Sequence, residues 1–112
     1  MSTQTGASTL KLEYVKTIGI VNNGTNGRGY ANPYDLALSK DGRIFVLNRC
    51  DPARRTAIRV GVCTLDEEYL NEFGNGYGTD DGQFNGPSEI AVDAAGNIYV
   101  VDSENSRVQV FN

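Results

Sequence analysis

Three arginines gather in one short stretch of the chain, and their side chains are well suited to binding a ligand. The stretch NRCDPARRTA contains Arg49, Arg54 and Arg55. A guanidinium group is planar and pairs with a carboxylate or a phosphate through two parallel hydrogen bonds. The cluster therefore predicts a loop that binds an anion.

Further candidates lie in two glycine-rich stretches, GIVNNGTNGRGYAN and GNGYGTDDGQFNG. They are Arg28, Tyr30, Tyr77, Asp80 and Asp81. Long loops on a rigid scaffold often carry binding function, so we expect these residues and the three arginines to form one binding rim. Two other interpretations stay open. The arginines could pair with Asp51, Asp80 or Asp81 of neighbouring loops, or they could contact another chain of the same assembly.

The sequence contains few of the residues and motifs that catalysis or metal binding requires. The chain has no histidine, which removes the most common metal ligand and the most common general base near neutral pH. The second glycine-rich stretch lacks the Lys-Ser/Thr pair and the following helix of a phosphate loop. Asp80, Asp81, Asp93 and Asp102 do not follow the alternating spacing of a calcium loop. We therefore predict no enzyme, no cofactor and no metal site, and we expect Asp102 to accept backbone hydrogen bonds in its own turn.

The two cysteines, Cys50 and Cys63, are too few for a disulfide framework. They fall at opposite ends of the expected strands, and a disulfide needs Cα atoms within about 7 Å of each other. We therefore predict that they do not form a bond within one chain, and that Cys63 fills space in the core.

Charge and hydropathy exclude some classes of function. A net charge of −4 argues against nucleic acid as the main ligand, because binding phosphates requires Lys and Arg. No apolar run approaches the roughly 20 residues that span a bilayer. The N-terminus MSTQTGAST lacks the features of a signal peptide, which favours the cytoplasm.

An internal repeat organises the whole chain. Residues 33–49, PYDLALSKDGRIFVLNR, align without gaps with residues 87–103, PSEIAVDAAGNIYVVDS, at an offset of 54. Upstream, residues 13–19 align with 68–74 at an offset of 55, and downstream 59–64 align with 107–112 at an offset of 48. Repeats of this length are typical of propellers and solenoids.

Short apolar runs between glycine-rich turns predict an all-β protein with four antiparallel strands in each repeat. The expected strands are 12–18, 34–38, 44–48, 59–63, 69–73, 88–92, 98–102 and 107–111. Several of these strands carry apolar residues on both faces, as in IFVL and IYVV. Strands of this kind are buried on both sides, which predicts sheets that are packed between neighbouring sheets.

The stretch GNGYGTDDGQFNGPSEIAVDAAGNIYVVDSENSRVQVFN resembles an NHL repeat almost position for position. The earlier copy resembles a degenerate NHL repeat, in which Asn48 replaces the Asp found at position 102. The resemblance implies blades of a six-bladed β-propeller. It further implies a protein-binding sensor domain, an RNA-binding domain like those of ubiquitin ligases, or occasionally a lyase with a metal at the central channel.

We expect a flexible tail at 1–11 and two NHL-like repeats at about 12–64 and 65–112, each with the strand order D-A-B-C from the outer strand D. The first D strand then has no blade, and the last blade lacks its D strand. Two blades would also leave two apolar faces exposed. Two ways of covering them stay open: three copies in a six-bladed ring, each donating its first strand to a neighbour, or further repeats of a longer chain.

In a propeller the D–A and B–C loops lie at one end of the blades, so we expect the predicted rim there. The acidic residues of the A–B and C–D loops lie at the other end; they are Asp41, Asp66, Glu67 and Glu68. We predict a non-catalytic propeller module for protein interaction or assembly, whose partners are other propeller blades and a protein. The alternative is a ligand- or RNA-binding domain that uses the arginine-rich loop. A propeller lyase is less favoured because the chain lacks histidine.

Overall fold

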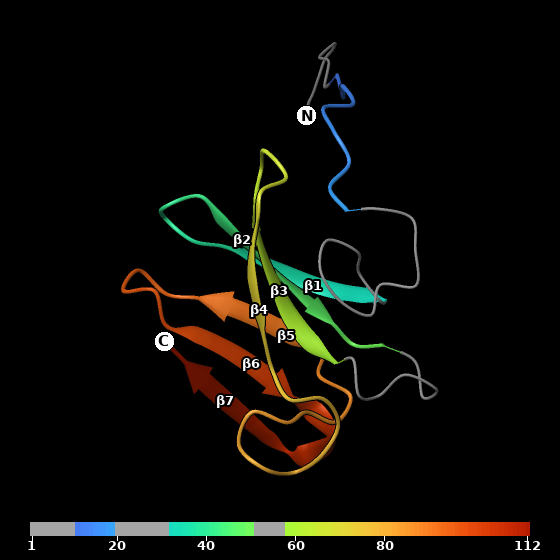
Figure 1. Cartoon of the computed structure of the whole chain (residues 1–112), viewed down its shortest axis with the longest axis vertical. Coiled ribbons are helices and arrows are strands. Elements are labelled where there is room, and N and C mark those ends of the chain that lie inside the picture. Colours follow the sequence, from blue (N-terminus) through green and yellow to red (C-terminus); the bar gives the residue numbers. More distant parts are fainter. Residues whose placement is uncertain (1–10, 20–31, 51–57) are drawn as a thin grey trace, which may run out of the picture.

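Two antiparallel sheets account for almost all regular structure in the computed structural model, which describes residues 11–19, 32–50 and 58–112 (Figure 1). The first sheet has the order β1 (Pro33–Leu38), β2 (Arg43–Asn48), β3 (Arg59–Thr64) and β4 (Tyr69–Phe73). The second sheet has the order β5 (Glu89–Val92), β6 (Ile98–Asp102) and β7 (Arg107–Phe111). One short 3-10 turn, η2 (Ser103–Asn105), joins β6 to β7. The predicted all-β class is confirmed.

Tight turns connect the first two strands of each sheet, as the sequence predicts. In the β1–β2 turn, the backbone N–H of Ser39 donates to the carbonyl of Arg43, and Gly42 has a φ of 89°. In the β5–β6 turn, the N–H of Asp93 donates to the carbonyl of Asn97, and Gly96 has a φ of 92°. Glycine accepts this left-handed conformation without a steric penalty, so both hairpins close where the repeat places them.

The expected strand at 12–18 is wrong. Residues 11–18 belong to neither sheet, and Leu12, Tyr14 and Val15 are exposed. The other expected strands agree with the structure to within one residue at each end. A strand needs a neighbouring strand to satisfy its backbone groups, and this segment has none among the described residues. The first sheet has four strands, with β4 as its outer strand, and the second sheet has three, as expected for a last blade that lacks its D strand.

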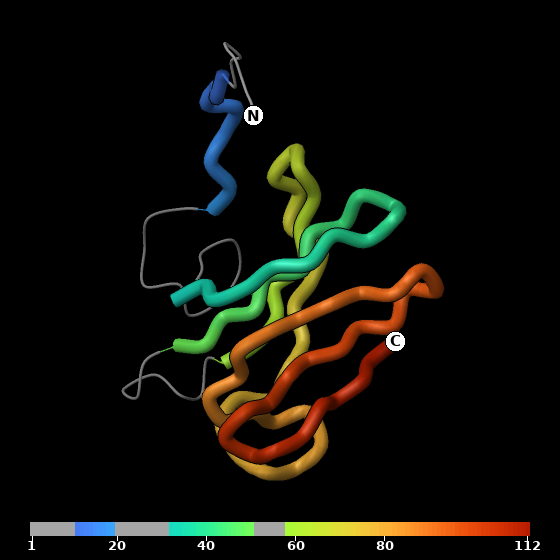
Figure 2. The backbone as a smooth tube through the Cα atoms, turned by 180° about the vertical axis from the view of Figure 1, so that it is seen from behind, coloured from blue at the N-terminus to red at the C-terminus, as the bar shows by residue number. Residues whose placement is uncertain are grey.

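The two sheets pack against each other along most of their length (Figure 2). Phe45, Leu47, Val60 and Val62 of the first sheet are buried in one cluster with residues of the second sheet. The second sheet contributes Ile90, Ile98 and Val100 to this cluster. A polar contact joins the sheets as well, because Oδ2 of Asp35 accepts a hydrogen bond from the backbone N–H of Ile90 at 2.9 Å.

Phe84 closes this core from the segment that runs from β4 to β5. Its side chain is fully buried, and its ring centroid lies 6.1 Å from that of Phe111. Gly74 begins the segment with a φ of 110°, and a Cβ there would lie 2.9 Å from Phe84 and 3.3 Å from the Cα of Arg59. The segment thus leaves the first sheet at a point where only glycine fits.

Both cysteines are free and buried, which confirms that they form no disulfide. Cys63 belongs to a second, smaller cluster with Ile44 and Val46, on the face of the first sheet that points away from the second sheet. Ile18 packs against this cluster.

Phe84→Ala should lower the free energy of unfolding by about 3–5 kcal/mol, because it removes a fully buried aromatic ring and leaves a cavity between the sheets. Urea unfolding followed by circular dichroism measures the change. Leu65→Ala, in the exposed β3–β4 turn, is the control and should change stability by less than about 0.5 kcal/mol. Equal effects of the two substitutions would contradict this description of the core.

Candidate functional site

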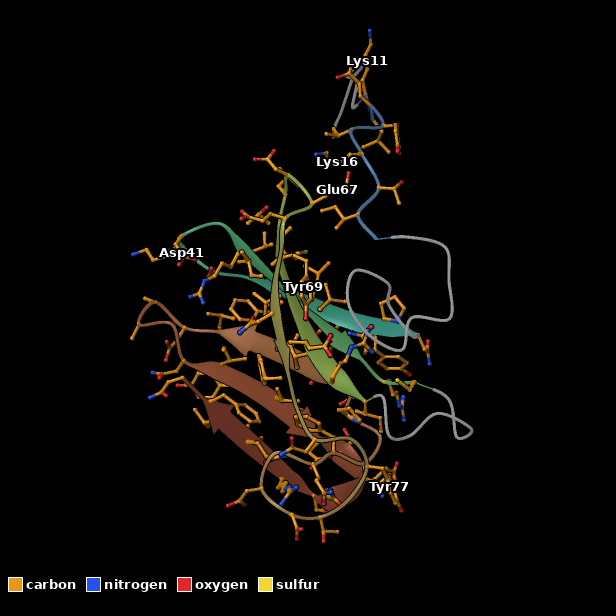
Figure 3. The ribbon with its side chains drawn as sticks, in the orientation of Figure 1. Lys11, Lys16, Asp41, Glu67, Tyr69 and Tyr77 are labelled. Carbon is orange, nitrogen blue, oxygen red and sulfur yellow. The ribbon has the colours of Figure 1, made fainter. Side chains whose placement is uncertain are left out.

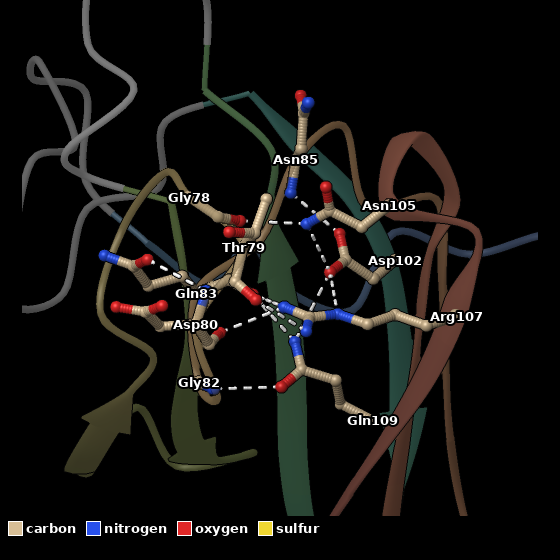
Figure 4. A network of polar contacts seen from close by, with 10 residues as sticks. All are labelled: Gly78, Thr79, Asp80, Gly82, Gln83, Asn85, Asp102, Asn105, Arg107 and Gln109. Atoms are coloured by element: carbon tan, nitrogen blue, oxygen red, sulfur yellow. Dashed lines mark hydrogen bonds and ion pairs between the residues drawn. The ribbon is translucent and has the colours of Figure 1, made fainter.

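A buried carboxylate at the end of β6 organises the largest polar network in the described residues (Figure 4). Asp102 is fully buried, and its Oδ1 accepts the backbone N–H of Asn85 at 2.7 Å. Its Oδ2 accepts hydrogen bonds from Asn105 Nδ2 at 2.9 Å and from Arg107 Nε at 2.8 Å. The backbone donor lies in the segment before β5, which corrects our expectation that Asp102 accepts backbone hydrogen bonds in its own turn; its contact in that turn is with the side chain of Asn105.

Arg107 and Gln109 of β7 extend this network to the loop that joins the two sheets. The guanidinium of Arg107 donates to the carbonyls of Thr79, Asp80 and Gln83 at 2.8–3.0 Å. Gln109 donates to the carbonyl of Gln83 at 2.7 Å and accepts the N–H of Gly82 at 2.9 Å. These contacts fix the backbone of the loop, so the network holds the connection between the sheets in one conformation.

At the equivalent position in the first sheet, Asn48 donates hydrogen bonds, whereas Asp102 accepts them. Asn48 is fully buried, and its amide donates to the carbonyls of Val46 and Arg59. A carboxylate cannot donate these hydrogen bonds, which explains the departure from Asp in the first repeat. The equivalent arginine, Arg59, pairs instead with Glu72 of β4 at 3.2 Å.

The predicted rim is only partly within the described residues. Arg28, Tyr30, Arg54 and Arg55 lie outside them, as does Asp51. Arg49 is half-buried, and its guanidinium carbon lies 4.5 Å from the ring centroid of Tyr34, which is a cation–π contact. In the described ranges it forms no ion pair with Asp80 or Asp81.

Tyr77, Asp80 and Asp81 lie on the exposed surface of the loop between β4 and β5. Tyr77 forms an isolated bridge with Phe84, and the carbonyl of Asp80 is one of the acceptors of Arg107. Figure 3 shows Tyr77 at the opposite end of the sheets from Asp41 and Glu67, as predicted for the two sets of loops. The structure therefore separates the two ends but does not join Arg49 to the acidic residues of the rim.

The other end carries a shallow hollow of about 170 Å³ between the β1–β2 and β5–β6 turns. Asp93 and Asp41 lie in its lining. Hydrogen bonds from Asn97 and then Tyr99 hold the pKa of Asp93 below its usual range. At Asp41, hydrogen bonds from Ser39 and then Arg43 lower the pKa in the same direction. Both carboxylates are thus engaged by their own turns.

Each sheet has one apolar face that does not contact the other sheet. In the first sheet this free face carries Leu36, Leu38, Ile44 and Val46, with Tyr34 at its edge. Leu36 is 55% exposed and Leu38 is 65% exposed. A hollow of about 300 Å³ lies on this face, lined by Pro33, Tyr34, Asp35, Leu36 and Val46. We call this surface the first free face.

The second free face lies on the far side of the second sheet. It carries Ala91, Tyr99, Val101, Val108 and Val110. Val108 is 56% exposed and Val110 is 58% exposed. A hollow of about 280 Å³ is lined partly by Ala91, Tyr99 and Val101 of this face.

The internal repeat relates the two free faces to the buried interface between the sheets. The first free face is the equivalent of Ile90, Val92, Ile98 and Val100, which pack against the first sheet. The second free face is the equivalent of Ala37, Phe45, Leu47, Val60 and Val62, which pack against the second sheet. The free faces therefore carry the two halves of an interface that the chain already forms once.

The sequence missed these free-face residues as individual site residues, although it predicted exposed faces. Aligning the two repeats position by position relates each of them to an apolar residue of the other repeat, such as Leu36 to Ile90 and Val108 to Val60.

The described residues carry neither a metal-binding cluster nor a membrane-spanning helix. In residues 11–19, 32–50 and 58–112, no group of three or more His, Cys, Asp and Glu side chains is arranged to hold a metal ion. No helix in the same ranges is long and apolar enough to cross a membrane.

Comparison with known families gives one match. The family described as NHL repeat matches residues 84–111, which run from Phe84 through all three strands of the second sheet. Asp102, Arg107 and Gln109 of the network and all residues of the second free face lie within the matched range. No curated protein matches the chain.

Asp102→Asn should lower the free energy of unfolding by about 1–3 kcal/mol, because the half-buried Arg107 loses its charged partner and the new amide group cannot accept all of the hydrogen bonds from Asn85, Asn105 and Arg107. Chemical denaturation measures the change. Asp81→Asn, exposed in the adjoining loop, is the control, with an expected effect within about 0.5 kcal/mol. An unchanged unfolding midpoint for Asp102→Asn would disprove the role of the network.

Tyr99→Phe should raise the pKa of Asp93, because it removes one of the hydrogen bonds that favour the charged carboxylate. A lowered pKa in the folded state stabilises the fold above the unfolded pKa of about 4, and this contribution is lost as pH falls through the folded value. The stability difference between parent and variant should therefore shrink below about pH 4. Carbon NMR of the carboxylates measures the pKa, and urea unfolding at a series of pH values measures the stability difference. The pKa of Asp41 should stay unchanged, and a rise there would point to a general disturbance.

Proposed function

We propose that this chain is a non-catalytic β-propeller module that acts by binding protein, and that further propeller blades cover its two free faces. The observation that carries the proposal is the exposure of Leu36 and Leu38 on the first free face and of Val108 and Val110 on the second, because these faces repeat the two halves of the interface between the sheets. Exposed apolar surfaces of this kind usually mark interaction sites. Three copies with two sheets each would supply a six-bladed ring, and further repeats of a longer chain would cover the same faces.

The alternative of a ligand- or RNA-binding rim has less support. The only described arginine of the predicted loop is Arg49, and its guanidinium is stacked on Tyr34. The net charge of −4 also disfavours binding to a polyanion. Binding to single-stranded RNA that falls steeply with salt would favour this alternative.

Three charge substitutions at residues of similar exposure test the proposal. Leu36→Asp places a charge on the first free face and Val110→Asp places one on the second, while Leu65→Asp lies in the β3–β4 turn. The parent chain should self-associate in sedimentation experiments. Each face variant should weaken association at least about tenfold, because it buries an unpaired charge, and Leu65→Asp should associate like the parent. A folded parent chain that stays monomeric at all concentrations would overturn self-association.

A mixture of the two face variants shows which faces meet. In a head-to-tail interface the first free face binds the second, so Leu36→Asp and Val110→Asp should form a 1:1 pair through their two intact faces. If identical faces met instead, each variant alone would still form a dimer through its intact face. That result would contradict the head-to-tail arrangement.

A further inference from the structure

We infer that residues 12–18 of one copy form the fourth strand of the second sheet of another copy, by pairing with the outer edge of β7. This inference rests on the proposed function, since it requires two copies to meet through their free faces. It names the segment that each copy contributes and the residues that pair.

The segment at 12–18 is the repeat equivalent of β4. Residues 13–19, EYVKTIG, align with residues 68–74, EYLNEFG, which contain β4 and the glycine after it. The two glycines have the same unusual backbone conformation, with a φ of 113° at Gly19 and 110° at Gly74. The segment therefore ends as a fourth strand ends, although it belongs to no sheet.

The segment also occupies the position of a fourth strand relative to the next sheet. Phe73 of β4 packs on the second sheet, with its ring centroid 5.0 Å from that of Phe111. Ile18 is the equivalent of Phe73, and it packs against the cluster of Ile44, Val46 and Cys63. Cys63 is in turn the equivalent of Phe111. Ile18 thus sits on the first sheet as Phe73 sits on the second.

What the segment lacks is a strand beside it. In the first sheet β4 pairs with β3, but the equivalent partner for residues 12–18 would belong to a sheet lying on the first free face. Leu12 is 88% exposed, Tyr14 is 81% exposed and Val15 is 79% exposed. Apolar and β-branched residues suit a strand, so the composition of the segment favours pairing.

The outer edge of β7 is the strand edge with which residues 12–18 would pair. No strand lies beside this edge within the described ranges, whereas the equivalent edge of β3 is covered by β4. When the second free face of one copy covers the first free face of another, β7 comes to lie where the partner of residues 12–18 is missing. A second copy would therefore cover the first free face and pair with residues 12–18 at the same time.

The register follows from the pairing of β3 with β4. Val60 pairs with Phe73 and Val62 pairs with Asn71. Applying the repeat offsets of 48 and 55 gives Val108 opposite Ile18 and Val110 opposite Lys16. Directly opposite residues in an antiparallel pair have Cα atoms about 4.5–5.5 Å apart, which suits a disulfide.

The test is a disulfide between copies of the full chain. Lys16→Cys with Val110→Cys, both exposed positions, should form intermolecular disulfides on mild oxidation, identified by mass spectrometry of the joined peptides. Lys16→Cys with Val108→Cys is the register control, because a shift of two residues moves the Cα atoms beyond the roughly 7 Å that a disulfide spans. The parent chain, whose two cysteines are buried, shows the background of cross-linking.

The outcomes separate this inference from the proposed function. A cross-link between positions 16 and 110 of different copies, absent in the register control, supports the strand exchange. An assembly by sedimentation without this cross-link overturns the strand exchange and leaves the proposed function standing. A cross-link within one copy also overturns the exchange, because the segment would then pair with its own chain. A folded monomer overturns both strand exchange and self-association.

Discussion

Apolar side chains on both faces of a sheet impose one requirement, which is that each sheet needs a neighbour on each side. Within this chain the requirement is met once, where Phe45, Leu47 and Val60 pack against Ile90, Ile98 and Val100. Burial of this apolar area is the main force that holds the two sheets together. The same requirement leaves one face of each sheet open, so the stability of the pair and its capacity to bind have a single physical origin.

The Asp102 network holds the segment that joins the two sheets against the second sheet. A buried carboxylate is costly unless it is paired and hydrogen-bonded. Asp102 meets this condition through Asn85, Asn105 and Arg107. Because Asn85 lies in the segment between the sheets and Arg107 also binds the loop carbonyls, the network couples the position of that segment to the second sheet. A fixed angle between the two sheets would also set the angle at which the next sheet can be added.

Much of the fold could be predicted from the sequence because its signals are local. Alternating apolar residues and glycine turns such as Gly42 and Gly96 placed seven strands among the described residues. The segment at 12–18 has the same local signals, yet it forms no strand, because pairing depends on a neighbour that local sequence does not contain. The wrong prediction of a strand at 12–18 is informative, because it shows that this segment lacks a partner strand among the described residues.

The candidate site was less predictable, because its contacts join residues that are far apart in the sequence. Asp102 was singled out, but its backbone partner at Asn85 becomes apparent only when the segment before β5 lies against β6. Arg49 was expected in a ligand-binding rim, and its guanidinium stacks on Tyr34 where the pairing of β1 with β2 is irregular. The free faces could have been found, because the repeat alignment alone relates Leu36 to the buried Ile90.

Head-to-tail binding has a consequence for the energetics of any assembly that this chain forms. Each added copy covers one pair of faces but leaves a new pair at the two ends, together with an open β7 edge and an unpaired segment at 12–18. Exposed sheet edges favour uncontrolled association. Only closure of a ring removes the last pair of faces and the last open edge in the same step, and it does so without the entropic cost of binding a further copy. The closed assembly would therefore be favoured over every open intermediate, and the angle between the two sheets would determine whether a ring can close.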